Sequence, residues 1–144
     1  MIEISPNEKD RIAKEGGFLY FIGDSMKPTI KTGCKLKISP VSLSKIQPGD
    51  IVIIDSGKAV ICHRMLARFT HFNKEHFIEK GDNCGYRLAR KRKISAILGK
   101  VREIEFADGF FKKAPFFNNS ITGLKYLIFS HLVGLLYKIK QTLC

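Results

Sequence analysis

Residues 51–69 read IVIIDSGKAVICHRMLARF, two apolar runs joined by a short polar stretch. The first run is continuous and rich in β-branched residues, which is typical of a buried strand. Asp55 to Lys58 contains Gly57 and predicts a turn. The second run, residues 59–69, is then expected to pair back on the first as a hairpin. This segment therefore predicts a protein built on a β-sheet.

Further strand-like runs lie on both sides of this hairpin. Residues 35–38 (KLKI) alternate polar and apolar side chains, as a half-exposed strand does. Three more strands are expected, at residues 17–22, 76–80 and 96–106. Together these runs predict a mainly β fold with a small sheet.

The composition changes after Phe106, and Asn118-Asn119-Ser120 then offers a helix N-cap. Residues 121–137 are largely apolar but contain Lys125, and they are short for a bilayer span of about 20 residues. We therefore divide the chain into a domain of residues 1–106 and a C-terminal extension with an apolar helix, residues 107–144. That helix is expected either to associate with a membrane or to pack on this domain or on a partner.

Composition and charge narrow the class of protein. The chain has 144 residues, 44% hydrophobic and 26% charged, which is typical of one globular domain and not of a disordered chain. The formal net charge of +12 favours an anionic partner, such as membrane lipid, nucleic acid or an acidic peptide. Residues 1–15 are polar and predict neither a secretory signal nor a transmembrane helix, so we expect a cytoplasmic or membrane-associated protein.

The cysteines predict neither a metal site nor a disulfide framework. Their positions lack metal-ligand spacing, and reduced thiols are expected without an export signal. The four are Cys34, Cys62, Cys84 and Cys144.

Three polar residues, well separated in the sequence, carry groups that suit nucleophilic catalysis. Ser25 lies on a turn bracketed by Gly23 and Pro28, directly after an apolar run. His63 lies within the second run of the hairpin, and Asp82 follows the expected strand of residues 76–80. A hydroxyl, an imidazole and a carboxylate are the parts of a serine nucleophile with a general base.

The motifs around these residues resemble those of type I signal peptidases and the related self-cleaving repressor peptidases. That superfamily carries Ser-Met-x-Pro, a Gly-Asp before a strand, a general base on a later strand, and a Gly-Asp-Asn or similar turn. This chain has them in the same order, at residues 25–28, 49–50, 63–64 and 81–83, and the resemblance spans roughly residues 17–104. Four motifs in order make this resemblance specific, whereas Ser-Met-x-Pro alone would be weak.

The base indicates a subtype of that family. His63-Arg64 stands where bacterial signal peptidases and the repressors have a lysine next to an arginine. It is similar to the histidine subtype of the endoplasmic reticulum, archaea and spore formers. A lysine must be desolvated to be neutral at pH 7, whereas a histidine already titrates near its working pH.

The resemblance implies a small coiled sheet or partly open barrel and a serine endopeptidase that cleaves signal or leader peptides. Ser25 would be the nucleophile, with its own backbone N–H as an oxyanion donor, and His63 the general base. No metal or cofactor is implied. The substrate would be an extended peptide or protein segment that adds alongside exposed strands, with small residues before the cut.

The resemblance leaves the third member of the catalytic unit open. In the histidine subtype an aspartate follows the Gly-Asp-Asn turn, but residues 84–93 contain no carboxylate. Asp82 is then predicted to orient His63, with Asp24 a distant second. Otherwise Ser25 and His63 act as a dyad, or the enzyme is weak or inactive. Arg64 is expected on the opposite face from His63, where it could pair with a carboxylate.

Other readings stay open at this stage. Without an acid, the chain could be a non-catalytic peptide-binding or membrane-adaptor domain on a decayed peptidase scaffold. Self-cleavage is disfavoured because the base is histidine. A basic run is either a solvated loop or a contact for anionic lipid headgroups or an acidic leader peptide. Nucleic acid is disfavoured as a partner, because the aromatic residues are not interleaved with the charges. The run comprises Arg87, Arg90, Lys91, Arg92 and Lys93.

Overall fold

The computed structural model describes residues 4–57, 59–84, 89–106 and 109–115, together with Ile128 and Leu132. These last two residues are helical and exposed. The rest of the predicted apolar helix, its predicted N-cap, Arg87 and Cys144 lie outside the described residues.

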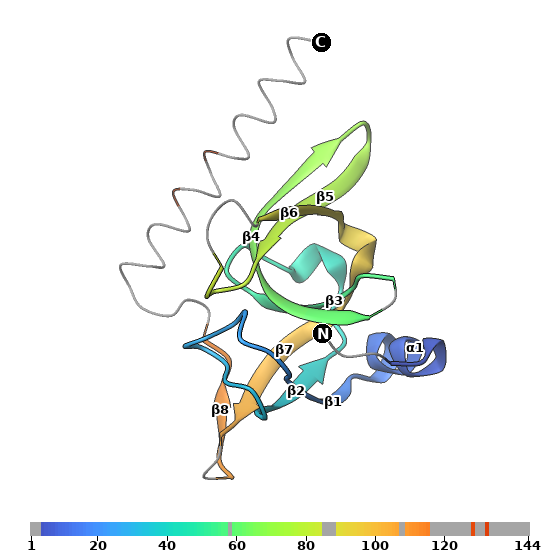
Figure 1. Cartoon of the computed structure of the whole chain (residues 1–144). Coiled ribbons are helices and arrows are strands. Elements are labelled where there is room, and N and C mark those ends of the chain that lie inside the picture. The colour runs from blue at the N-terminus through green and yellow to red at the C-terminus, as the bar shows by residue number, and fades with distance from the viewer. Residues whose placement is uncertain are drawn as a thin grey trace.

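One strongly curved antiparallel sheet of eight strands forms the body of the protein, and it is not closed into a barrel (Figure 1). The strand order is β1-β2-β7-β3-β4-β5-β6, and β8 pairs with β7. The prediction of a mainly β fold is confirmed. The strands are β1 (Gly17–Tyr20), β2 (Lys35–Ser39), β3 (Ile51–Asp55), β4 (Val60–His71), β5 (Lys74–Lys80), β6 (Arg90–Lys93), β7 (Ile97–Glu105) and β8 (Phe111–Lys113).

The predicted central hairpin is present as β3 and β4. Asp55 pairs with Val60 next to the turn, and Val52 pairs with His63 further along. On its other side β3 pairs with β7, so β3 is an interior strand of the sheet.

Both faces of β3 are buried, which explains its unbroken apolar sequence. Ile51 and Ile53 pack in one core cluster with residues of β1, β2 and α1. Val52 and Ile54 point the other way and pack in a second cluster that includes Met65 of β4. The sheet therefore has a core on each side, and the residues that flank β3 in space are held firmly.

A helix at the N-terminus, α1 (Pro6–Glu15), was not predicted. Its start carries a recognisable signal, because the Ser5 side chain caps the helix by accepting a hydrogen bond from the Glu8 amide at 3.2 Å, and Pro6 occupies the first turn. The helix was not predicted because its sequence is mostly polar and shows no apolar periodicity. Only Ile12 of α1 is buried, at 1% exposure. Two short 3₁₀ helices lie at Leu43–Lys45 and Ile94–Ala96.

The sheet also includes two strands that were not predicted, β6 and β8. Arg90–Lys93 of the basic run form the edge strand β6, which pairs with β5. After the turn at Gly109, β8 pairs with β7, so Phe111–Lys113 belongs to the same sheet. Pro115 contributes as well, because its carbonyl accepts a hydrogen bond from Arg64 at 3.0 Å.

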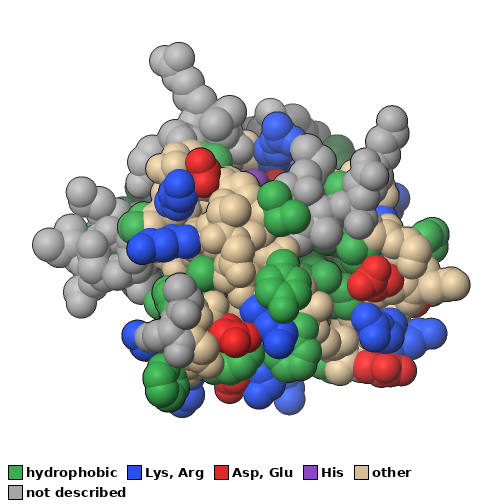
Figure 2. All heavy atoms as spheres, turned by 60° about the horizontal axis from the view of Figure 1, so that its bottom comes forward, with side chains coloured by type: hydrophobic (Ala, Val, Ile, Leu, Met, Phe, Trp, Pro, Cys, Tyr) green, Lys and Arg blue, Asp and Glu red, His purple; other side chains and the backbone are tan. Residues whose placement is uncertain are grey.

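Within the described residues, no helix has the length and apolar character needed to cross a membrane. Figure 2 shows lysine and arginine side chains spread over one face among acidic and apolar ones, not gathered in a single patch.

The cap of α1 gives a test of how this helix is held. Replacing Ser5 with alanine is expected to lower the free energy of unfolding by about 1 kcal/mol, because the Glu8 amide loses its acceptor. Urea denaturation measures the change. Ser42→Ala is the matched control, since Ser42 precedes a 3₁₀ helix without a side-chain cap bond. Equal effects of the two substitutions would contradict this account of the cap.

Candidate active site

Ser25 lies on the loop that connects β1 to β2. The loop is closed at its base, where the Phe21 amide donates to the Cys34 carbonyl at 2.8 Å. Met26 and Ile30, which follow Ser25 in this loop, are completely buried in the core. These apolar anchors fix the backbone next to Ser25, so its side chain has a defined position.

A second turn, after β5, supports Ser25 from the other side. The Asn83 amide donates to the Ser25 carbonyl at 2.8 Å. A Cβ at Gly81 would lie 2.4 Å from that carbonyl oxygen, so only glycine allows this close approach. The buried Lys80 donates from Nζ to the Cys84 carbonyl at 2.6 Å and closes the turn.

The predicted nucleophile and base are brought together. His63 on β4 has its Nε2 atom 3.1 Å from the Ser25 Oγ atom, within the range needed for proton transfer. The two residues are 38 positions apart in the sequence, but in the curved sheet β4 lies next to the loop that follows β1. The His63 side chain is 18% exposed, so a substrate can approach it.

The other ring nitrogen of His63 contacts a residue that was not predicted. His63 Nδ1 lies 2.5 Å from Oε2 of Glu79 on β5, and the Glu79 side chain has no exposed surface. The second carboxylate oxygen of Glu79 accepts from Arg92 Nε on β6 at 2.9 Å. Ser25, His63 and Glu79 thus form a continuous chain of hydroxyl, imidazole and carboxylate.

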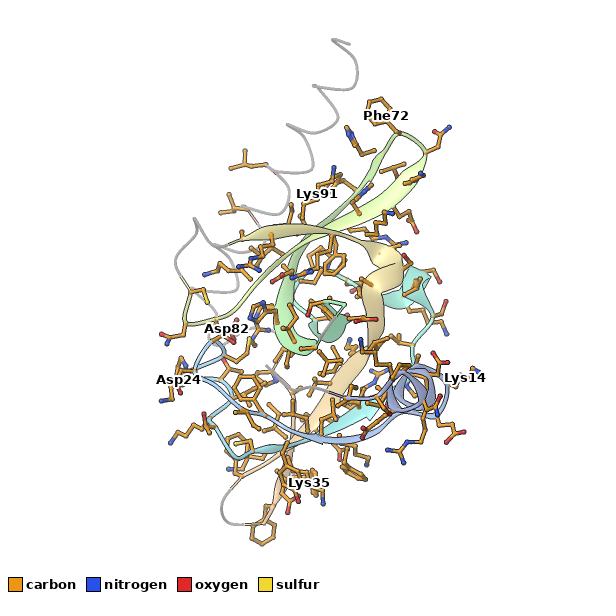
Figure 3. All side chains as sticks on the ribbon, turned by 45° about the vertical axis from the view of Figure 1, so that its right-hand side comes forward. Lys14, Asp24, Lys35, Phe72, Asp82 and Lys91 are labelled. Atoms are coloured by element: carbon orange, nitrogen blue, oxygen red, sulfur yellow. The ribbon has the colours of Figure 1, made fainter. Side chains whose placement is uncertain are left out.

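Asp82, the predicted acid, is engaged elsewhere, and this corrects the expectation that it orients His63. Its two oxygens accept from Arg64 Nε at 2.8 Å and from Arg64 Nη2 at 2.7 Å. Thr29 Oγ1 donates to it at 2.6 Å. Asp24, the second candidate, is exposed and pairs with Lys27 at 2.8 Å; Figure 3 shows it on the same side of the molecule as Asp82.

Strand alternation explains why Glu79 and not Asp82 reaches the histidine. His63 and Met65 share one face of β4, and Glu79 pairs opposite Met65, so its side chain lies on the same face as His63. Arg64 lies on the other face, as predicted, and meets Asp82 beyond the end of β5. The family pattern directed attention to residues after the Gly-Asp-Asn turn. A lone carboxylate inside the apolar part of a predicted strand was the signal that could have identified Glu79.

Two opposing influences set the ionisation of Glu79. Its burial raises the pKa, but hydrogen bonds and charges from His63 and then Arg92 outweigh burial, so the pKa is lowered. The carboxylate is therefore ionised at neutral pH and accepts a hydrogen bond from the N–H group at His63 Nδ1. That tautomer leaves Nε2 free to accept the proton of Ser25.

Arg64 has a structural role at the centre of the site. It is completely buried, and besides Asp82 it donates to the carbonyls of Gly49 at 2.7 Å and Pro115 at 3.0 Å. The Gly49-Asp50 turn is held by further contacts, because Asp50 accepts from the Gln47 amide at 2.9 Å and forms an ion pair with Lys100. These contacts join the turns that surround the candidate catalytic residues.

A small apolar pocket of about 40 Å³ adjoins Ser25 and His63. A volume of this size holds roughly two or three water molecules, so it suits a small side chain. Burial raises the pKa of the Cys62 thiol in its wall, which keeps that thiol neutral and unreactive. The remaining walls come from Leu19, Phe21, Ile22, Leu36, Ile53, Val60 and Ile61.

The described residues contain no group of three or more histidine, cysteine, aspartate or glutamate side chains arranged to hold a metal ion. Cys34, Cys62 and Cys84 form no disulfide in the described part of the chain.

Comparison with protein-family models, with curated proteins and with solved structures gave no match. The chemistry of the site is therefore interpreted from its own geometry.

The two aspartates offer a test of their assignments. Asp82→Ala is expected to destabilise the protein by about 3–5 kcal/mol, because it leaves the buried Arg64 guanidinium without its carboxylate. Chemical denaturation measures the loss. Asp24→Ala is the control, and it is expected to change stability little, since that pair is exposed. Similar stabilities of the two variants would show that the Arg64–Asp82 pair does not hold the fold.

Proposed function

We propose that this protein is a serine endopeptidase that resembles the histidine-type signal peptidases and cleaves signal or leader peptides. One observation carries the proposal: Ser25 Oγ, the two ring nitrogens of His63 and the Glu79 carboxylate follow one another at 3.1 and 2.5 Å. This is the geometry of a nucleophile, a general base and an orienting acid.

The reaction follows from that geometry. His63 Nε2 takes the proton of Ser25 as Oγ attacks the substrate carbonyl carbon and forms a tetrahedral intermediate. The Ser25 backbone N–H is the proposed oxyanion donor. His63 then gives the proton to the leaving amine as the peptide bond breaks, and the acyl-enzyme is hydrolysed by a water that His63 deprotonates. Glu79 holds the imidazole in the productive tautomer and stabilises its protonated form.

The surroundings of Ser25 support an extended peptide as substrate. β1 is an end strand of the sheet and leads directly into the loop that carries Ser25. Among the described strands it pairs only with β2, so its other edge can accept main-chain hydrogen bonds from an added strand. The small apolar pocket would then take the side chain before the cut, which favours a small residue.

An anionic membrane surface remains a proposed partner through β6 and the predicted C-terminal helix. Arg90, Lys91 and Lys93 are exposed, and each could contribute roughly 1 kcal/mol near anionic lipid. Arg92 is turned inward to Glu79 and is not part of that surface.

The alternative of a non-catalytic binding domain loses the observation that motivated it. That reading depended on the lack of an acid after the Gly-Asp-Asn turn. Glu79, which precedes that turn, lies where an acid partner of His63 is needed.

The proposed activity is tested by incubating the purified protein with a library of signal and leader peptides, with lipid present, and analysing the products by mass spectrometry. The wild type is expected to cleave. Ser25→Ala and His63→Ala are each expected to lower kcat by about 10⁶-fold, the loss seen when the serine or histidine of subtilisin is removed. Ser44→Ala, at an exposed serine, is the matched control and should retain full activity. If the wild type cleaves nothing while circular dichroism shows that it is folded, the proposal of a peptidase is refuted. The alternative of a non-catalytic binding domain would then be favoured.

The assignment of the acid has its own test. Glu79→Gln is expected to lower kcat by about 10⁴-fold, because an amide cannot fix the imidazole tautomer as a carboxylate does. Asp82→Asn, assayed at a temperature where it is folded, should lower kcat less than Glu79→Gln does, since Asp82 contacts Arg64 and not His63. The reverse order of effects would restore Asp82 as the acid.

A further inference from the structure

The basic run of β6 separates into two faces once the strand forms. Arg90 and Arg92 pair opposite Glu79 and Phe77 and share one face of the sheet, whereas Lys91 and Lys93 lie on the other face. Lys91 lies over the Phe69 ring, with its Nζ 5.6 Å from the ring centroid. Arg92 points inward, and its side chain is only 20% exposed. One arginine of this basic run, Arg92, therefore contacts the proposed catalytic unit and does not contribute to the surface charge.

Arg92 completes the hydrogen bonding of a carboxylate that solvent does not reach. Glu79 is fully buried, with one oxygen 2.5 Å from His63 Nδ1 and the other accepting from Arg92 Nε at 2.9 Å. Two partners on two oxygens restrict rotation of the carboxylate about its terminal torsion. Without Arg92, one oxygen would lose the partner that compensates for its buried charge.

The charged neighbours of this unit come from two strands. Among the described residues, the titratable or basic side chains that act on Glu79 are His63 from β4 and Arg92 from β6. His63 in turn faces Ser25 from the loop after β1. Since Ser25 carries no charge, Arg92 is the permanent positive charge that balances the buried carboxylate.

We propose that Arg92 is a positioning residue: it holds the Glu79 carboxylate in line with His63 and keeps the histidine–glutamate pair in the proton state that the reaction requires. This inference rests on the proposed function, and it places in the catalytic unit a residue from a run expected to contact solvent or lipid. Arginine suits the position because its planar guanidinium stays charged and donates in a fixed direction. A lysine would supply the charge without the same direction.

The chain contains a matched control for the loss of an arginine–glutamate pair. Arg68 on β4 donates from Nε and Nη2 to Glu75 on β5, at 3.2 and 2.5 Å, and Glu75 is 46% exposed. Arg68→Gln removes the same charge and the same kind of pair as Arg92→Gln. It does so at a pair that makes no contact with the catalytic residues.

The experiment compares wild type, Arg92→Gln, Arg92→Lys and Arg68→Gln with a soluble peptide and no lipid, recording kcat, KM and the pH profile. Arg92→Gln is expected to lower kcat by about 10–100-fold with little change in KM, by analogy with the loss of hydrogen-bond partners that orient metal-bound histidines. Removing a positive charge strengthens proton binding by the histidine–glutamate pair, so the acidic limb of the profile should move to higher pH. Arg92→Lys should keep the limb in place and lower kcat, and Arg68→Gln should match the wild type.

A second readout does not depend on activity. The titration of the His63 ring, followed by NMR, should have its midpoint at higher pH in Arg92→Gln than in the wild type and in Arg68→Gln. If the wild type cleaves no peptide but this difference is seen, the proposed function fails and the positioning of the pair by Arg92 stands. If Arg92→Gln and Arg68→Gln give the same kcat, pH profile and titration, the inference is overturned while the peptidase stands. If Arg92→Gln does not fold, an Arg92→Lys variant with wild-type kcat would equally overturn it.

Discussion

The buried ion pair between Arg64 and Asp82 is the interaction on which the geometry of the site depends. Asp82 lies on the turn after β5, and this turn also donates from Asn83 to the carbonyl of Ser25. Asp82 accepts in addition from Thr29, on the same loop as Ser25. One carboxylate therefore links β4, the turn after β5 and the loop of the nucleophile. Because the pair is shielded from solvent, removing either member would leave a buried charge unbalanced.

Neighbouring residues of β4 divide the chemical and structural tasks. His63 and Arg64 follow one another and therefore point to opposite faces of the strand. Each has its own carboxylate, Glu79 for His63 and Asp82 for Arg64. The two carboxylates are only three positions apart in the sequence, so a shift in the pairing of β4 with β5 would exchange or break both contacts. The geometry of the candidate site is a consequence of strand register.

The strongly basic composition serves the interior as well as the surface. Arg64 and Lys80 are buried, Arg92 is turned toward Glu79, and Lys100 pairs with the buried Asp50. Each places its charge against a carboxylate or a carbonyl near the proposed catalytic residues. The fold thus places some basic side chains in solvent and uses others to hold the residues of the candidate site, a division that the net charge alone does not show.

The sequence by itself determined the strand segments and two of the catalytic candidates. The apolar runs around residues 51–69 specified a buried strand and its hairpin partner, because strand periodicity is a local property. The ordered motifs identified Ser25 and His63, which the structure places in hydrogen-bond contact. Only the tertiary structure decided between Asp82 and Glu79 as the partner of the histidine, since that choice depends on which residues of β4 and β5 lie opposite one another. The tertiary structure likewise decided the inward position of Arg92. The sequence of β6 has no apolar pattern that predicts a strand, and β6 is a strand because it pairs with β5.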